Sequence, residues 1–363
     1  MSENPTDTPE TPTTIQTEYE KISAFVAEEF QTEESILEQG VPTYYLRQPQ
    51  ETKQKFLKLL NKLAPMNLIA ILRRTHNGRV VLKIIPKPPV KKSNILINWG
   101  LLFATIATTF LSGYFMLPSN VIDPFVGGIA FTVTIMAVLG MHEMGHKIIA
   151  QKRGVEATPP YFIPGIPPLG TFGAVIMQKS LPPNKDALFD IGADGPITGF
   201  IVATFASIVG LMLLIPTTPM EGTTSIQIPI MWTLLARLLA GLNLFPLTTG
   251  NQILLLHPIT FAGWVGLLVT MLNLLPAAML DGGHVARSLA GEKVRLALTG
   301  LSIAYLVLMG FWPMALFVVF ISMYRHPGPL DDVSSLSASR KALTVLLIVI
   351  FILCSFPPEI PVL

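Results

Sequence analysis

The sequence predicts an α-helical polytopic membrane protein with about six transmembrane helices and a re-entrant loop, preceded by a small N-terminal α/β cytosolic module. Half of the 363 residues are hydrophobic and only 13% are charged, whereas a typical soluble domain carries about 25% charged residues. Long apolar runs appear after residue 93, and several reach the ~20 residues that a helix needs to cross a bilayer. Charged residues are concentrated in the first 93 residues.

The first 93 residues are predicted to form a tail and a compact module. Residues 1–14 are rich in Pro, Thr and acids, a composition typical of disorder. Residues 15–93 are expected to form the α/β module and a basic linker, and residues 94–363 the membrane domain. Helical spacing of apolar residues predicts helices at Tyr19–Gln31 and Thr52–Leu63. Two β-rich runs predict strands at Leu68–Arg73 and Arg79–Ile85, and the pair Asn77-Gly78 between them favours a tight hairpin turn.

The module changes charge sign along its length. Acids dominate residues 1–39, whereas residues 40–93 are basic, with Glu51 as their one acid. A basic surface beside a membrane is attracted to anionic lipid headgroups. Nucleic-acid binding is the other interpretation of such a patch, but the bilayer already accounts for the charge. We therefore expect a lipid partner and no nucleic acid.

Six apolar segments are the candidate spans, of which the last is marginal in length. They are Ile95–Met116, Phe125–Ala150, Asp194–Ile215, Ile259–Leu280, Leu296–Met323 and Ala342–Phe356. The fifth is either one long tilted helix or two short halves bent at Pro313, and the sequence leaves both open. The segment between the third and fourth spans, residues 216–258, has Arg237 as its one basic residue and is expected to lie outside.

Basic residues predict the orientation of these spans, because cytoplasmic flanks are enriched in lysine and arginine. Lys87, Lys91 and Lys92 precede the first span, which indicates a cytosolic N-terminus. Basic residues near positions 150 and 290 follow the second and fourth spans, and they indicate that these two spans end in the cytosol. The N-terminus resembles neither a signal peptide nor an arginine-rich transit peptide. We therefore expect an integral, multi-pass protein of a prokaryotic cytoplasmic membrane.

The strongest chemical motif is His142-Glu143-Met144-Gly145-His146, inside the second span. Positions i and i+4 of a helix project from one face, so His142 and His146 can reach one zinc ion, with Glu143 beside them as general base. Ionisable groups inside an apolar helix are costly and mark functional sites. The alternative is a hydrogen-bonded cluster between helices.

A catalytic zinc needs a third protein ligand and one open position. Asp281 follows the fourth span and is expected at the same cytosolic depth as His142 and His146, which favours it as that ligand. His284 is the rival, although we expect it to be a supporting or surface residue. Pro276 cannot donate to the carbonyl of Leu272, so the helix is expected to open there. Asn273 could then bind the freed backbone, a substrate carbonyl or the developing oxyanion. The alternative is simple helix packing.

These motifs resemble the site-2 protease family of intramembrane zinc metalloproteases, peptidase family M50. The residues that carry the resemblance are His142–His146, Asn273-Leu274-Leu275-Pro276 and Asp281-Gly282. Looser matches at Phe172-Gly173-Ala174, Phe189-Asp190-Ile191-Gly192, Gly195-Pro196, His257-Pro258 and Ala262-Gly263-Trp264 are similar to the cyanobacterial and plant plastid branch, the gravitropism-deficient and yellow-green-like proteases. Ala278-Met279 stands where the family often has Gly-Gln, and the acidic N-terminus differs from a plastid transit peptide.

The resemblance implies one Zn²⁺ per chain, held by His142, His146 and Asp281, with Glu143 catalytic. It implies regulated intramembrane proteolysis, the hydrolysis of peptide bonds in or next to transmembrane segments of other membrane proteins. The β-prone stretch Thr171–Gln178 could then be a re-entrant strand whose edge pairs with an extended substrate. The alternative is an amphipathic surface loop.

Two other functions remain open from the sequence. A metal transporter also places His and Asp in membrane helices, although it would spread ligands along the depth of the bilayer and would not need Glu143. A catalytically inactive relative acting as a scaffold would not need the complete set of zinc and base residues. The sequence specifies neither the substrate, nor a prior cleavage, nor an oligomeric state.

Overall fold

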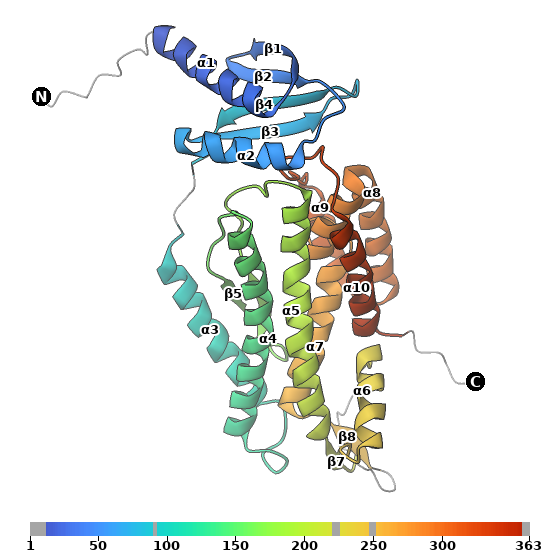
Figure 1. Cartoon of the computed structure of the whole chain (residues 1–363). Helices are drawn as coiled ribbons and strands as arrows, with labels where there is room; N and C mark the ends of the chain where they lie inside the picture. The colour runs from blue at the N-terminus through green and yellow to red at the C-terminus, as the bar shows by residue number, and fades with distance from the viewer. Residues whose placement is uncertain (1–11, 90–92, 220–225, 247–251, 358–363) are drawn as a thin grey trace, which may run out of the picture. The chain divides into compact units, whose positions relative to one another are not determined.

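The computed structural model describes residues 12–89, 93–219, 226–246 and 252–357, and the chain divides into two compact units. The first unit holds the chain up to Val90 together with two short later segments, Pro183–Lys185 and Pro329–Ser335. The second unit holds the rest. Figure 1 shows the elements of both, with strands in the first unit and mostly helices in the second.

The first unit is a four-stranded antiparallel sheet with two helices. Its elements are α1 (Pro12–Glu29), β1 (Thr32–Glu38), β2 (Val41–Leu46), α2 (Lys53–Leu63), the short 3₁₀ turn Ala64–Met66, β3 (Leu68–Arg74) and β4 (Val80–Pro86), with strand order β1-β2-β4-β3. Both helices and the β3–β4 hairpin lie where the sequence predicts them. Of the predicted tail, residues 1–11 lie outside the described residues, and α1 already begins at Pro12.

Strands β1 and β2 were not among the predicted elements. β1 carries Glu33, Glu34 and Glu38 and is mostly exposed, and acidic residues are depleted in strands. β1 lies at the edge of the sheet, where charged side chains reach water and discourage further strand pairing. Its acids pair with bases two strands away, as in Lys83 Nζ to Glu38 Oε2 at 2.8 Å.

The helices cover the sheet with apolar side chains. Val26 of α1 and Phe56 and Leu59 of α2 are fully buried, as is Leu72 of β3. Burial of such a side chain contributes roughly 1.5–3 kcal/mol. Outside this core, the carboxylates of Glu28 and Glu29 hydrogen-bond Lys62 and hold its pKa above the usual value.

The edge of the sheet at β3 is covered by a late segment of the chain. The N–H of Leu72 donates to the carbonyl of Leu330 at 2.9 Å, and the N–H of Asp332 donates to the carbonyl of Leu72 at 3.2 Å. The N–H of Asp331 then donates to the carbonyl of Pro183 at 3.0 Å. We call residues 324–337, between α9 and α10, the connector, because its central residues belong to the first unit.

The second unit is a helical bundle with two small β-hairpins. Its elements are α3 (Ile95–Tyr114), α4 (Pro124–Lys152), β5 (Tyr161–Pro164), β6 (Thr171–Val175), α5 (Lys185–Met212), β7 (Ile215–Thr217), α6 (Ile230–Gly241), β8 (Ile253–Leu255), α7 (Pro258–Leu274), α8 (Asp281–Leu308), α9 (Trp312–Ser322) and α10 (Ala338–Cys354). Helix α4 packs against α3 and α7, and α7 also contacts α8 and α10. The largest core cluster joins α5, α6, α7 and α10.

Three of these helices are long and apolar enough to cross a membrane: α3, α4 and α5, of 20, 29 and 28 residues. Their faces carry exposed hydrophobic side chains, for example Phe103 and Ile201 at 63% and 61% exposure. Helices α6, α7 and α9 are apolar but shorter. The structure therefore describes a mostly helical membrane unit. Length and composition of the described helices support three spans and do not confirm the predicted six.

Several predicted boundaries were wrong. Helix α7 ends at Leu274 and not at Leu280, because Pro276 cannot donate to a helical carbonyl and disfavours helical backbone before it. Asp281 therefore begins a new helix, α8, in place of closing the previous one. Helix α5 begins at Lys185, before the predicted Asp194. The segment that the sequence places outside, residues 216–258, contains the helix α6, which was not among the predicted elements.

The segment Leu296–Met323 resolves into two helices. Helix α8 ends at Leu308 and α9 begins at Trp312. Gly310 lies between them with φ +80°, a backbone conformation that glycine adopts without steric cost. Pro313 occupies the first turn of α9, where a missing N–H is tolerated. The sequence left open one long helix or two shorter ones, and the structure has two.

One buried carboxylate ties α4, α5 and α10 together. Asp190 of α5 accepts two hydrogen bonds from the Arg340 guanidinium, at 3.0 and 2.9 Å, and a further one from Arg153 Nη2. The Asp190 side chain is 10% exposed, and those of Arg153 and Arg340 are 35% and 24% exposed. This pairing of one acid with two bases resists separation of the three helices.

Asp190→Asn should destabilise the second unit. The change removes the charge that two partly buried guanidinium groups share, at a cost of about 2–3 kcal/mol after allowance for their solvent exposure. Thermal unfolding of the purified protein in detergent measures this. The control is Lys83→Met in the exposed pair with Glu38, for which no measurable shift is expected. Equal melting temperatures for Asp190→Asn and wild type would contradict the structural role.

Candidate metal centre

Helix α4 carries two of the three residues of the centre. The helix is capped by the Asp123 carboxylate, which accepts from the N–H groups of Phe125 and Val126, and it continues through an apolar sequence to Lys152. His142 and His146 lie one turn apart and are 3% and 5% exposed, and Glu143 between them is 6% exposed. The predicted motif thus lies on a buried helix face.

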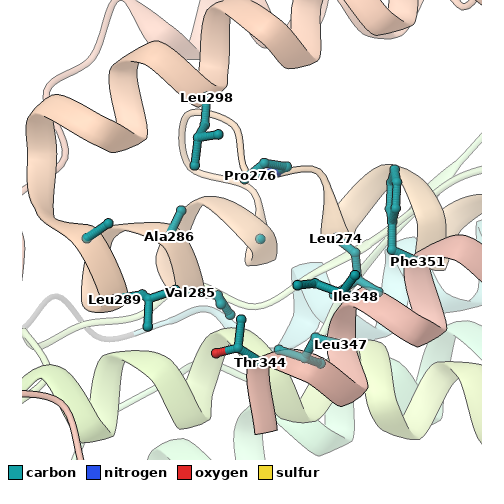
Figure 2. A pocket seen from close by; sticks show the side chains of 12 residues that line it. Leu274, Pro276, Val285, Ala286, Leu289, Leu298, Thr344, Leu347, Ile348 and Phe351 are labelled. Atoms are coloured by element: carbon teal, nitrogen blue, oxygen red, sulfur yellow. The ribbon is translucent and has the colours of Figure 1, made fainter. Parts of the chain in front are cut away.

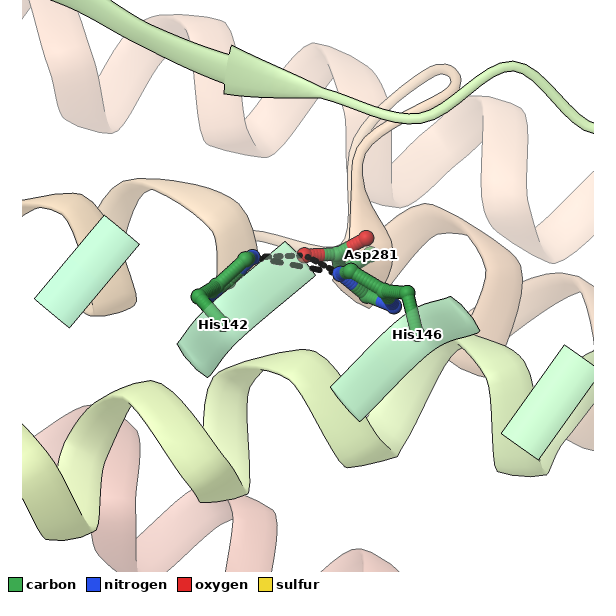
Figure 3. A group of neighbouring side chains, drawn as sticks. All are labelled: His142, His146 and Asp281. Carbon is green, nitrogen blue, oxygen red and sulfur yellow. Dashed lines mark hydrogen bonds and ion pairs between the residues drawn. The ribbon is translucent and has the colours of Figure 1, made fainter. Parts of the chain in front are cut away.

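Asp281 completes the group from the first turn of α8. Its Oδ2 atom lies 3.3 Å from His142 Nε2 and 3.3 Å from His146 Nε2, and the two Nε2 atoms are 3.1 Å apart. Figure 3 shows the three side chains pointing toward one common position. Among the described residues, this is the group of His, Cys, Asp and Glu side chains that could hold a metal ion.

The donor set and its spacing fit zinc. Two imidazoles and one carboxylate are a known catalytic zinc ligand set, and bonds of 2.0–2.2 Å in a tetrahedral site separate neighbouring ligand atoms by about 3.3–3.6 Å. The three distances among these atoms, 3.1, 3.3 and 3.3 Å, are close to that edge length. Three protein ligands leave one tetrahedral position for water or substrate.

Glycines on α5 leave room for the two imidazole rings. A Cβ at Gly195 would lie 2.0 Å from His146 Nε2, and a Cβ at Gly199 would lie 2.9 Å from His142 Nδ1. On the facing helix, a Cβ at Gly145 would lie 2.5 Å from the Thr198 hydroxyl. Close approach of helices through small residues is typical of membrane bundles, and here it places α5 directly against the rings.

The second nitrogen of His146 is also engaged. His146 Nδ1 lies 2.6 Å from the carbonyl oxygen of Ile191 on α5. A carbonyl only accepts, so Nδ1 carries the proton and Nε2 presents its lone pair to the position shared with Asp281. A backbone carbonyl that orients a ligating imidazole in this way is a common feature of metal sites.

Glu143 and Asn273 lie beside the group in positions that suit catalysis. The Glu143 carboxylate accepts a hydrogen bond from the backbone N–H of Ile176, directly after strand β6. Asn273, on the last turn of α7, has Nδ2 at 3.4 Å from His142 Nε2. The centre therefore brings together all five residues that the sequence analysis proposed for catalysis and metal binding.

His284, the rival ligand, is engaged elsewhere. Its Nδ1 lies 2.8 Å from Nε2 of His326, and the two rings meet edge to face. The sequence analysis missed His326, because it lies in a loop far along the chain and belongs to no motif. The structure thus separates a three-residue ligand group from a neighbouring histidine pair.

The strand predicted near the site is present. β6 pairs antiparallel with β5, from Tyr161 opposite Val175 to Pro164 opposite Thr171. β5 contacts α3, and β6 contacts α4, the helix of the metal ligands. Among the described residues, β6 has β5 as its one strand neighbour. Its other edge is therefore free of strand pairing close to Glu143.

An apolar pocket lies next to the first turn of α8. It has a volume of about 330 Å³ and is bounded by the end of α7, by α8 and by α10, with Thr344 as a polar residue in its wall (Figure 2). Gly282, Val285 and Leu289 line it from one face of α8. Asp281 precedes Gly282 and lies four residues before Val285, so the pocket adjoins the turn of α8 that carries Asp281.

Comparisons with known proteins point to one family. The family model described as "Peptidase family M50" matches residues 130–315. The chain is 30% identical over 246 residues to "Probable zinc metalloprotease EGY1, chloroplastic" of Arabidopsis thaliana, covering 64% of this chain and 44% of that protein. It is 26% identical over 287 residues to "Probable zinc metalloprotease EGY2, chloroplastic" of the same plant, covering 75% and 51%. The chain thus spans about half the length of these relatives, and no solved structure matches it.

Gly195→Ala should impair metal binding at the centre. The added methyl group would overlap the His146 ring, so the ring must leave the position that it shares with Asp281. We expect metal affinity to fall at least ~10-fold, as for other changes beside a ligating histidine, measured by chelator competition. The control is Gly300→Ala in α8, where a Cβ meets nothing within 4 Å. Equal affinities for the two variants would contradict this packing.

Proposed function

Because the chain belongs to peptidase family M50, we propose that it is a zinc-dependent intramembrane endopeptidase. It hydrolyses peptide bonds in or next to transmembrane segments of other membrane proteins, in regulated intramembrane proteolysis. The observation that carries this proposal is the convergence of His142, His146 and Asp281 on one position, with Glu143 beside them inside an apolar unit. Buried ionisable groups of this kind are costly in a membrane and are kept for function.

Each residue of the centre has a role in the proposal. His142, His146 and Asp281 hold one Zn²⁺ per chain. When bound, zinc supplies Lewis-acid chemistry that activates water and polarises the scissile carbonyl. Glu143 accepts the proton of the attacking water and returns it to the leaving amine as general base and then acid. Asn273 donates its amide N–H to the carbonyl oxygen on which negative charge develops.

The free edge of β6 is proposed to bind the substrate. A transmembrane helix hides its carbonyls in its own hydrogen bonds, so a substrate must unwind before Glu143 can act on it. An unwound segment can pair with an exposed strand edge through main-chain hydrogen bonds. β6 leads directly to Ile176, whose N–H contacts Glu143. A strand docked there lies next to the general base.

The membrane arrangement is proposed from helices and charges together. Helices α3, α4 and α5 are full spans by length, and we propose that α7 and α10 also cross the membrane. We propose that α8 and α9, which contact each other, form a hairpin that returns to the side from which α8 starts, because the connector after α9 pairs with β3. The basic residues before α3 favour a cytosolic N-terminal unit. The named relatives are chloroplast proteins, whereas the sequence favours a prokaryotic cytoplasmic membrane. Both interpretations agree on an integral membrane protein.

Glu143→Gln should abolish proteolysis while leaving the metal bound. The amide keeps the shape of the side chain but cannot accept the proton of water, and loss of a general base typically costs 10²–10⁴-fold in rate. Cleavage of a single-span substrate by purified protein in detergent is followed by mass spectrometry, which also locates the cut. Zinc content is measured on the same samples.

Asp281→Asn and a zinc chelator provide the matching comparisons. Both should stop cleavage, because both remove the metal, and readdition of zinc should restore only the chelated wild type. Cleavage by Glu143→Gln at the wild-type rate would overturn the assignment of the base. Zinc transport into liposomes by wild-type protein without any cleavage would favour a transporter.

Substrates whose helix unwinds easily should be cut faster. Replacing two leucines beside the cleavage site with Gly-Pro removes a helical hydrogen bond and lowers the cost of unwinding by roughly 3 kcal/mol or more. The measurement compares kcat/KM for the two substrates with wild-type protein. A substrate carrying the same pair ten residues away is the control, and equal rates for all three would exclude unwinding as a determinant.

A further inference from the structure

A buried histidine pair lies next to the metal centre and takes no part in the proposed chemistry. His284 follows Asp281 on α8, and His326 lies in the connector, where it is 5% exposed. His284 Nδ1 and His326 Nε2 are 2.8 Å apart. Both residues belong to the second unit, so their contact lies within one compact body.

The direction of the hydrogen bonds in this pair can be assigned. The backbone N–H of Gly328 donates to His326 Nδ1 at 3.0 Å, which leaves that nitrogen as an acceptor without a proton. In a neutral imidazole the other nitrogen then carries the proton, so His326 Nε2–H donates to His284 Nδ1. His284 keeps its own proton on Nε2. The connector thus acts on His284 as a fixed donor.

The first turn of α8 has few other side chains to hold it in place. Asp281 is followed by Gly282 and Gly283, and Leu280 before it provides no side-chain cap. The glycines press against the carbonyls of Leu274 and Ala277, where a Cβ would lie at 2.2 and 2.5 Å. His284 is therefore the first residue after Asp281 whose side chain can anchor this turn.

The connector is itself held near His326. Gly328 has φ +70°, and a Cβ there would lie 2.9 Å from the Arg287 guanidinium on α8. Further along the connector, the N–H of Ser337 donates to Asp186 Oδ1 at 2.9 Å. These contacts fix the loop on both sides, so the imidazole of His326 has a defined place from which to donate.

We propose that His326 is a positioning residue for the metal centre: by donating to His284 it fixes the first turn of α8 and hence Asp281. This inference rests on the proposed function, since it takes Asp281 as a metal ligand. Residues that hold a ligand from outside the coordination sphere typically contribute 10–100-fold to metal affinity. His326 supplies that support from a loop remote in sequence.

Two isosteric variants of the full-length protein in detergent test this role. His326→Gln places an amide near the position of Nε2 and can still donate to His284. His326→Asn places its amide near Nδ1, where it can accept from Gly328 but cannot reach His284. Zinc affinity is measured by chelator competition, and the absorption spectrum of the Co²⁺-loaded protein reports ligand geometry. Thermal unfolding is measured alongside, with His76→Asn, at an exposed histidine, as control.

We expect His326→Gln to bind zinc nearly as tightly as wild type and His326→Asn to bind about 10–100-fold more weakly, with an altered Co²⁺ spectrum. His284→Ala should weaken binding similarly, and His284→Ala combined with His326→Asn should add little, since both break one contact. Equal affinities for the Gln and Asn variants, whether at the wild-type value or below it, would overturn the proposal. Failure of wild type to bind zinc would instead overturn the proposed function.

Discussion

The close approach of α5 to α4 is the constraint on which the metal centre depends. The two imidazole rings fill space that any side chain on the facing surface of α5 would need, as the positions of Gly195 and Gly199 show. The same approach brings the Ile191 carbonyl within reach of His146. Without it, His146 would lose its orienting acceptor, and two polar rings would face lipid, where an unpaired polar group costs several kcal/mol.

Several other buried polar groups of the second unit are also paired within it. Asp190 is matched by two arginines, and His284 by His326. Each pair joins segments that are distant in sequence, so that satisfying one buried group also sets the spacing of two elements. These paired groups therefore help to fix the geometry of the bundle.

The local parts of the site could be predicted from sequence, and the remote parts could not. His142, Glu143 and His146 follow from helical periodicity, and Asp281 from an argument about depth in the bilayer. The end of α7 was misjudged because apolar residues continue past Pro276 to Leu280. β1 was missed because its glutamates are tolerated in a strand only where that strand lies at the edge of a sheet. Which strand lies at the edge depends on how the whole sheet is assembled, so the segment itself does not reveal it. His326 carries no local signal, since its partner is set by tertiary contact alone.

The pairing of β3 with the connector has a consequence for how the chain is made. Arg73 Nη1 donates to the carbonyl of Leu330, across 257 positions of sequence. During synthesis from the N-terminus, the first unit therefore emerges long before the segment that covers its β3 edge. That edge stays open while the helices of the second unit are inserted, and uncovered edges invite mispairing. The first unit reaches its final form only after residues 329–335 have left the ribosome.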